Sequence, residues 1–154
     1  MMVELASIAA VAMASISSDE PANVKVVTTE TIIAAPPAKV WDAVRDVYAV
    51  DTRLVPGMVT KVERAGDVRT VTFTNGFVVK ERIIAVDDRS RRITYSAVGG
   101  KATYHVATMQ VTANGRDGSK VIWQTRFLPA ELEPFISQNM QAGSTVMKAH
   151  LETQ

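Results

Sequence analysis

The clearest hydrophobic pattern in the chain lies at its C-terminal end, between residues 129 and 154. Apolar residues recur there at spacings of three and four, the period of a helix with one buried side. They are Leu132, Phe135, Ile136, Met140, Gly143, Val146, Met147 and Leu151. Glu131 and Glu133 lie near the start and Lys148 near the end, which suits the polarity of the helix dipole. The pattern predicts one long amphipathic helix that closes the chain.

Most of the preceding chain alternates apolar and polar residues with the period of a β-strand. The predicted strands are Val24–Ala35, Met58–Arg64, Val68–Thr74, Phe77–Val86, Arg92–Val98, Tyr104–Ala113 and Lys120–Leu128. Asn75-Gly76 is a strong hairpin signal, and Pro36-Pro37 ends the first strand and opens a short helical insert. A helix cannot bury its apolar side alone, so the elements predict an α+β fold in which a curved antiparallel sheet wraps around the C-terminal helix.

The first residues of the chain allow two interpretations. Residues 3–16 form an apolar run that is too short to span a bilayer. One interpretation is an N-terminal helix, and the other is an atypical export signal, since Ala12-Met13-Ala14 resembles a cleavage site although Glu4 replaces the usual positive charge. We therefore separate residues 1–22 from a single domain at 23–154. We expect a cytoplasmic protein, or an exported one if residues 1–18 act as a signal peptide.

Composition narrows the classes of partner. The 154 residues carry 17 basic and 16 acidic side chains, a net charge of +1, which argues against a nucleic-acid partner. The sequence has no cysteine and only two histidines, so it predicts neither a disulfide, a metal site nor a metal cofactor. No glycine-rich dinucleotide motif and no nucleophile elbow occurs, so no cofactor is expected. The pattern also predicts no stable membrane insertion, and it leaves the oligomeric state open.

Two charged residues fall on otherwise apolar faces of the predicted strands. Side chains alternate along a strand, which places Arg69 and Glu81 among inward-facing residues. Buried charges are costly unless they are paired, so we expect these two to form an ion pair at the floor of a cavity. The predicted apolar lining of that cavity is Val71, Phe73, Val79, Ile83, Tyr95, Trp123, Phe127 and, from the helix, Met140.

Several assignments stay open at this stage. The Arg69–Glu81 pair suits a fold-specifying polar cluster as well as an active site, and Tyr95 and Trp123 suit plain core as well as ligand contacts. The strand at residues 104–113 does not show which face is inward, because both of its faces carry residues that pack well in a core. His105 is interpreted as a surface residue or a strand histidine with its hydrogen bonds satisfied.

Three stretches resemble the START / Bet v 1-like (SRPBCC) superfamily. Residues 33–41 resemble the strand leading into its first helix, and Val79-Lys80-Glu81-Arg82 resembles a central strand of its polyketide cyclase/dehydrase branch. Residues 121–129 resemble the last strand running into the gripping helix. The resemblance covers roughly Val24 to Leu151 and implies a helix-grip fold. Similarity to lachrymatory factor synthase-like proteins of that branch implies cavity positions at Arg69, Glu81, Tyr95, Tyr104 and Trp123.

Two functions follow as hypotheses. The first is binding or transport of a small, largely apolar molecule, lipid-, polyketide- or hormone-like, between sheet and helix. The alternative is a cofactor-free cyclase, dehydratase or isomerase, with Glu81 as general acid or base and with Arg69 and Tyr104 stabilising negative charge. The sequence favours binding, because nothing beyond the ion pair points to chemistry.

Overall fold

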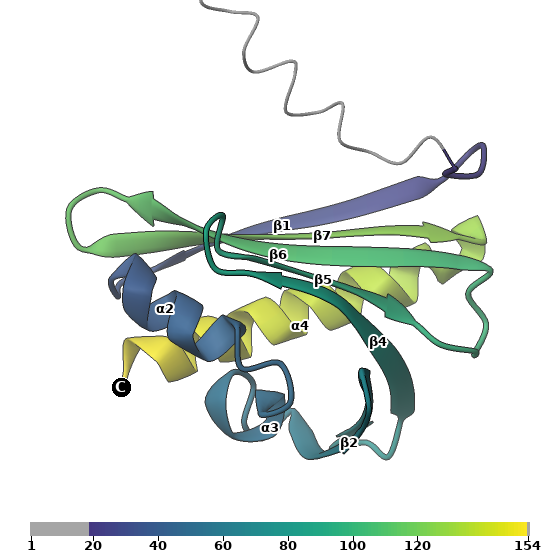
Figure 1. The fold of residues 1–154 in the computed structure, drawn as a ribbon, viewed down its shortest axis with the longest axis horizontal. Coiled ribbons are helices and arrows are strands. Elements are labelled where there is room, and N and C mark those ends of the chain that lie inside the picture. Colours follow the sequence, from purple (N-terminus) through teal and green to yellow (C-terminus); the bar gives the residue numbers. More distant parts are fainter. Residues whose placement is uncertain (1–18, 154) are drawn as a thin grey trace, which may run out of the picture.

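The computed structural model describes residues 19–153, and its main element is one antiparallel sheet (Figure 1). Its strands are β1 (Lys25–Ile33), β2 (Val59–Ala65), β3 (Val68–Phe73), β4 (Val78–Asp87), β5 (Arg92–Ala97), β6 (Tyr104–Asn114) and β7 (Gly118–Leu128). They lie in the order β1-β7-β6-β5-β4-β3-β2, so the first strand pairs with the last. The expected strands and their hairpin order are confirmed, with ends displaced by one or two residues.

The predicted C-terminal helix is confirmed as α4 (Glu133–Glu152), which follows a short 3-10 turn, η1 (Ala130–Leu132). Figure 1 shows α4 lying along the sheet beneath β6 and β7. Its buried residues are Met140, Gly143, Ser144, Met147 and Leu151. Two positions differ from the pattern. Phe135 is 49% exposed, and its ring packs on exposed Phe77. Ser144, which is not part of the apolar pattern, is also buried, and its hydroxyl is hydrogen-bonded to that of Thr29 at 3.1 Å.

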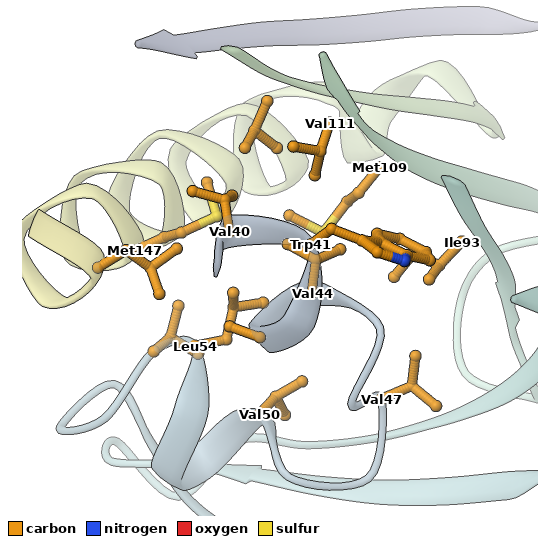
Figure 2. Packing of buried hydrophobic residues seen from close by; sticks show 14 of the residues in the cluster. Val40, Trp41, Val44, Val47, Val50, Leu54, Ile93, Met109, Val111 and Met147 are labelled. Carbon is orange, nitrogen blue, oxygen red and sulfur yellow. The ribbon is translucent and has the colours of Figure 1, made fainter. Parts of the chain in front are cut away.

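The helical insert forms α2 (Pro37–Val44) and α3 (Val50–Arg53), which pack under the sheet beside α4 (Figure 1). Pro37 begins α2 at a position where its missing N–H costs no helical hydrogen bond. Figure 2 shows apolar side chains of the insert converging with Met147 of α4 and Met109 of β6. The Trp41 Nε1–H donates to Asp88 Oδ1 at 2.9 Å, which fastens α2 to the β4–β5 hairpin. The core therefore lies between the insert, α4 and the sheet.

Residues 1–18 lie outside the described residues, so the two interpretations of the N-terminal segment stay predictions, as does the boundary near residue 22. None of the helices at residues 19–153 is long and apolar enough to cross a bilayer.

Candidate functional site

The predicted ion pair lies in the ladder between β3 and β4, where Arg69 and Glu81 are directly opposite each other. Arg69 Nε and Nη2 approach Glu81 Oε1 at 2.9 and 2.8 Å, and the two side chains are only 6% and 15% exposed. The predicted pairing and burial are confirmed. Strand alternation was sufficient to find the pair, because a cross-strand register places residues of the same face side by side.

Two further contacts hold the Arg69 side chain of the pair. Arg69 Nη1 donates to the carbonyl of Val47 at 2.6 Å, which ties β3 to the connection between α2 and α3. The Arg69 guanidinium also lies over the Tyr95 ring, with Cζ 4.9 Å from the ring centroid. Tyr95 Oη in turn accepts a hydrogen bond from Trp123 Nε1 at 3.0 Å. A connected polar cluster thus crosses β3, β4, β5 and β7.

Electrostatics keep the Tyr95 hydroxyl protonated. Burial raises the pKa of Tyr95 well above its usual value, and the nearby Glu81 carboxylate raises this pKa further. The hydroxyl therefore remains a neutral hydrogen-bond donor at any ordinary pH.

The cluster borders a cavity of about 80 Å³ between the sheet, α3 and α4. Arg69 and Glu81 line it, as do four of the predicted apolar residues, namely Val71, Phe73, Tyr95 and Trp123. The other four predicted lining residues lie elsewhere in the interior. Val79 and Ile83 pack against the main core, and Phe127 and Met140 are buried, but none of the four borders the cavity.

The cavity has further lining residues that the strand pattern did not identify: Val50, Leu54, Val55, Met58, Val59, Met109, Asn139, Gly143 and Met147. Most belong to the helical insert, the start of β2 or the inner side of α4. Helical spacing marked Gly143 and Met147 as inward, but it does not show which inward residues meet a cavity. The lining contains three methionines, whose unbranched side chains adapt readily to different shapes.

Gly143 lies where the backbone of α4 makes a close contact with Trp123 of β7. A Cβ atom at this position would lie 3.0 and 3.2 Å from Cζ3 and Cη2 of Trp123. The absence of a side chain therefore lets the helix backbone rest directly on the indole ring, which forms one wall of the cavity.

Tyr104 does not belong to this site, which corrects the placement expected from the resemblance. Its hydroxyl donates to Glu20 Oε2 at 3.3 Å, and Arg126 Nε and Nη2 donate to the two oxygens of Glu20 at 2.6 and 2.7 Å. The alternation of β6 explains the difference, since Ala107, Met109 and Val111 take the inner face and leave Tyr104 on the outer one. The Arg126 hydrogen bonds hold the pKa of Glu20 below its usual value.

His105 shares the inner face of β6 with Ala107 and lies close to the polar cluster. Its Nδ1 accepts a hydrogen bond from the Ala97 N–H at 3.0 Å, so its proton is on Nε2, and its ring centroid is 6.3 Å from that of Tyr95. Burial lowers the pKa of His105, against the opposing effect of Glu81. The histidine is thus a hydrogen-bonded strand residue, one of the two interpretations that the sequence left open.

Metal ligation has no support among residues 19–153, where no three histidine or acidic side chains gather at a spacing that would hold an ion. The groups that border the cavity can instead bind polar atoms and transfer a proton. They comprise a carboxylate, a guanidinium and a neutral phenol.

Known structures share this architecture. The protein XoxI from Bacillus cereus is 23% identical, with a TM-score of 0.70 over 83% of this chain and 93% of that chain. Norcoclaurine synthase from Thalictrum flavum is 24% identical, with a TM-score of 0.67 over 82% and 85%. A Streptomyces aromatase/cyclase is 15% identical, with a TM-score of 0.70 over 84% and 94%. At these identities the likeness establishes the fold alone, the helix-grip fold of Bet v 1-like proteins.

The family of the protein is identified from its sequence. Residues 25–152 match the family model described as polyketide cyclase / dehydrase and lipid transport. The chain therefore belongs to this family, which confirms the resemblance to the polyketide cyclase/dehydrase branch of the superfamily. Among curated protein sequences, none matches the chain.

Proposed function

We propose that the protein binds a small, largely apolar molecule in the cavity between the sheet and α4. The observation that carries the proposal is the Arg69–Glu81 pair, which borders an otherwise mainly apolar cavity. Ligand sites typically combine an apolar wall with a few placed polar groups. The family is consistent with this, since its description includes lipid transport.

The size of the cavity limits how such a molecule is held. A volume of about 80 Å³ is room for two or three water molecules, whereas sites for drug-sized ligands span roughly 300–1,000 Å³. A ligand of that size requires side chains to move, and the methionine lining (Met58, Met109 and Met147) has the flexibility to do so. The proposal therefore includes enlargement of the cavity on binding.

A titration with N-phenyl-1-naphthylamine, a neutral apolar fluorescent probe, tests the proposal. Val71→Phe fills the cavity from β3, and Val78→Phe makes the same change at a position that is 51% exposed on β4. We expect a Kd in the micromolar range for wild type, at least tenfold weaker binding for Val71→Phe and unchanged binding for Val78→Phe. A folded Val71→Phe variant that binds the probe as wild type does would refute the proposal. Native mass spectrometry of the purified protein then identifies any molecule it retains.

Catalysis is the second candidate, and the Glu81 carboxylate at the cavity wall is the observation that favours it. Glu81 would act as general acid or base, and Arg69 and Tyr95 would stabilise negative charge in place of Tyr104. Incubating the retained molecule with wild type and with Glu81→Gln separates the candidates. A molecule returned unchanged by both supports binding. Turnover that falls by on the order of a hundredfold or more in Glu81→Gln supports an enzyme.

A further inference from the structure

Arg69 contacts only one of the two carboxylate oxygens of Glu81. The two Arg69 nitrogens that contact Glu81, Nε and Nη2, both approach the same oxygen, Oε1, at 2.9 and 2.8 Å. Within residues 19–153, no hydrogen bond reaches the other oxygen, Oε2. Oε2 is not fully buried, so a molecule can approach it. Since Glu81 lines the cavity, a charged acceptor is available there.

The neighbouring Tyr95 hydroxyl accepts a hydrogen bond but donates none within the described residues. Its oxygen accepts the Trp123 Nε1 hydrogen bond at 3.0 Å, while its own proton reaches no acceptor within the described part of the chain. Burial keeps this phenol neutral, so it offers a donor to the cavity. The Arg69 guanidinium, in contrast, already donates to Glu81 and to the Val47 carbonyl, and its face lies against the Tyr95 ring.

From this arrangement we infer that the ligand carries a neutral hydroxyl group, of an alcohol, phenol or enol, which donates to Glu81 Oε2 and accepts from Tyr95 Oη. The inference rests on the proposed function and specifies the polar end of its ligand. A hydroxyl is donor and acceptor at once, so it complements both groups. A ketone only accepts, and a carboxylate only accepts and adds a second negative charge beside Glu81. The inference therefore excludes free fatty acids as the preferred ligands.

Competition against N-phenyl-1-naphthylamine tests the inference with three eight-carbon molecules: octan-1-ol, octan-2-one and octanoate at pH 7.5. We expect octan-1-ol to bind about fivefold more tightly than octan-2-one, or ~1 kcal/mol, the usual net contribution of one hydrogen bond. We expect it to bind at least tenfold more tightly than octanoate. The ketone comparison separates the donor requirement from simple hydrophobicity, because both molecules are neutral.

Glu81→Gln removes the negative charge and leaves Arg69 without a charged partner, so octanoate is expected to bind this variant at least as tightly as octan-1-ol does. Glu63→Gln, an exposed glutamate on β2, is the matched control and should keep the wild-type order. A ketone that binds wild type as tightly as the alcohol overturns the inference, whether or not Glu81→Gln folds. An unchanged octanoate-to-octanol ratio in folded Glu81→Gln does the same. If the fluorescent probe and all three competitors fail to bind, the proposed function falls, and the inference falls with it.

Discussion

Gly143→Ala sets two opposing effects against each other at the contact between α4 and the sheet. Alanine is favoured over glycine inside a helix by about 0.5–1 kcal/mol. The added Cβ, however, would lie 3.0 and 3.2 Å from two carbons of the Trp123 ring. Contacts this short require the ring to move, and overpacking in a core typically costs about 1–3 kcal/mol. The sign of the stability change depends on whether the ring can give way.

The structure indicates that it cannot do so freely. Trp123 donates its Nε1–H to Tyr95 Oη at 3.0 Å, so moving the indole weakens a hydrogen bond with a net value of about 1 kcal/mol. We therefore expect Gly143→Ala to lower the free energy of unfolding by roughly 1–2 kcal/mol after the helix-propensity gain is subtracted. Displacing the wall of the cavity should also weaken binding of the fluorescent probe.

Urea denaturation of wild type and four variants measures this. Ala142→Gly, at the exposed neighbouring position, calibrates local helix propensity and should cost about 1 kcal/mol. Trp123→Phe removes Cζ3 and Cη2, the two ring atoms nearest the new Cβ, so adding Gly143→Ala to it should be neutral or stabilising. If Gly143→Ala alone stabilises wild type by as much as Ala142→Gly destabilises it, the close contact has no energetic consequence and the reasoning is refuted.

Three further predictions concern charged and titratable groups. Arg69→Met should lower stability by about 3–5 kcal/mol in urea denaturation, because it leaves the Glu81 carboxylate unpaired. Adding Glu81→Leu should recover most of this loss, and a double variant as unstable as the sum of the singles would contradict the pairing. The lowered pKa of His105 means that wild type loses stability as pH falls below about 6.5, by up to about 1.4 kcal/mol per pH unit. His105→Asn should show a shallower fall of Tm over that range, and parallel curves would contradict this. Since the pKa of Glu20 is lowered, its bonds with Arg126 stabilise the fold above pH 4.5 and are lost as pH falls through its folded pKa. Glu20→Gln should cost about 1 kcal/mol at pH 7 and progressively less as pH falls below 4.5, and a cost that does not change with pH would argue against the ion pair.

Strand alternation predicted the sheet and its charged pair because each strand keeps a period of two and buries one face. Arg69 and Glu81 stand out on such faces as charges among apolar residues, and the structure places them opposite each other. The prediction was weakest where both faces of a strand carry residues able to pack in a core. In β6 the alternation did not show that Ala107 and its neighbours form the inner face, so nothing in the strand pattern contradicted the resemblance, which placed Tyr104 in the cavity.

The exact lining of the cavity could not be predicted from the sequence, for a different reason. Burial is a property of one residue and its periodicity, whereas a cavity depends on which buried side chains leave space between elements distant in sequence. Phe127 and Met140 are buried as predicted, yet neither borders the cavity. Leu54, on the helical insert, does border it. Nothing in the local pattern of the insert indicates that it packs beside β3 and α4.

The donors of Arg69 determine which experiment can separate structure from function at this site. One nitrogen holds the Val47 carbonyl and two hold Glu81 Oε1, so every substitution of Arg69 disturbs the fold and the cavity together. Glu81 Oε2 takes part in neither contact. Glu81→Gln replaces only one of the two carboxylate oxygens and keeps an acceptor for Arg69. A change in ligand preference in a folded Glu81→Gln variant therefore reports on the oxygen that we infer contacts the ligand. For this reason the choice between a binding protein and an enzyme depends on Glu81, and the fold depends on Arg69.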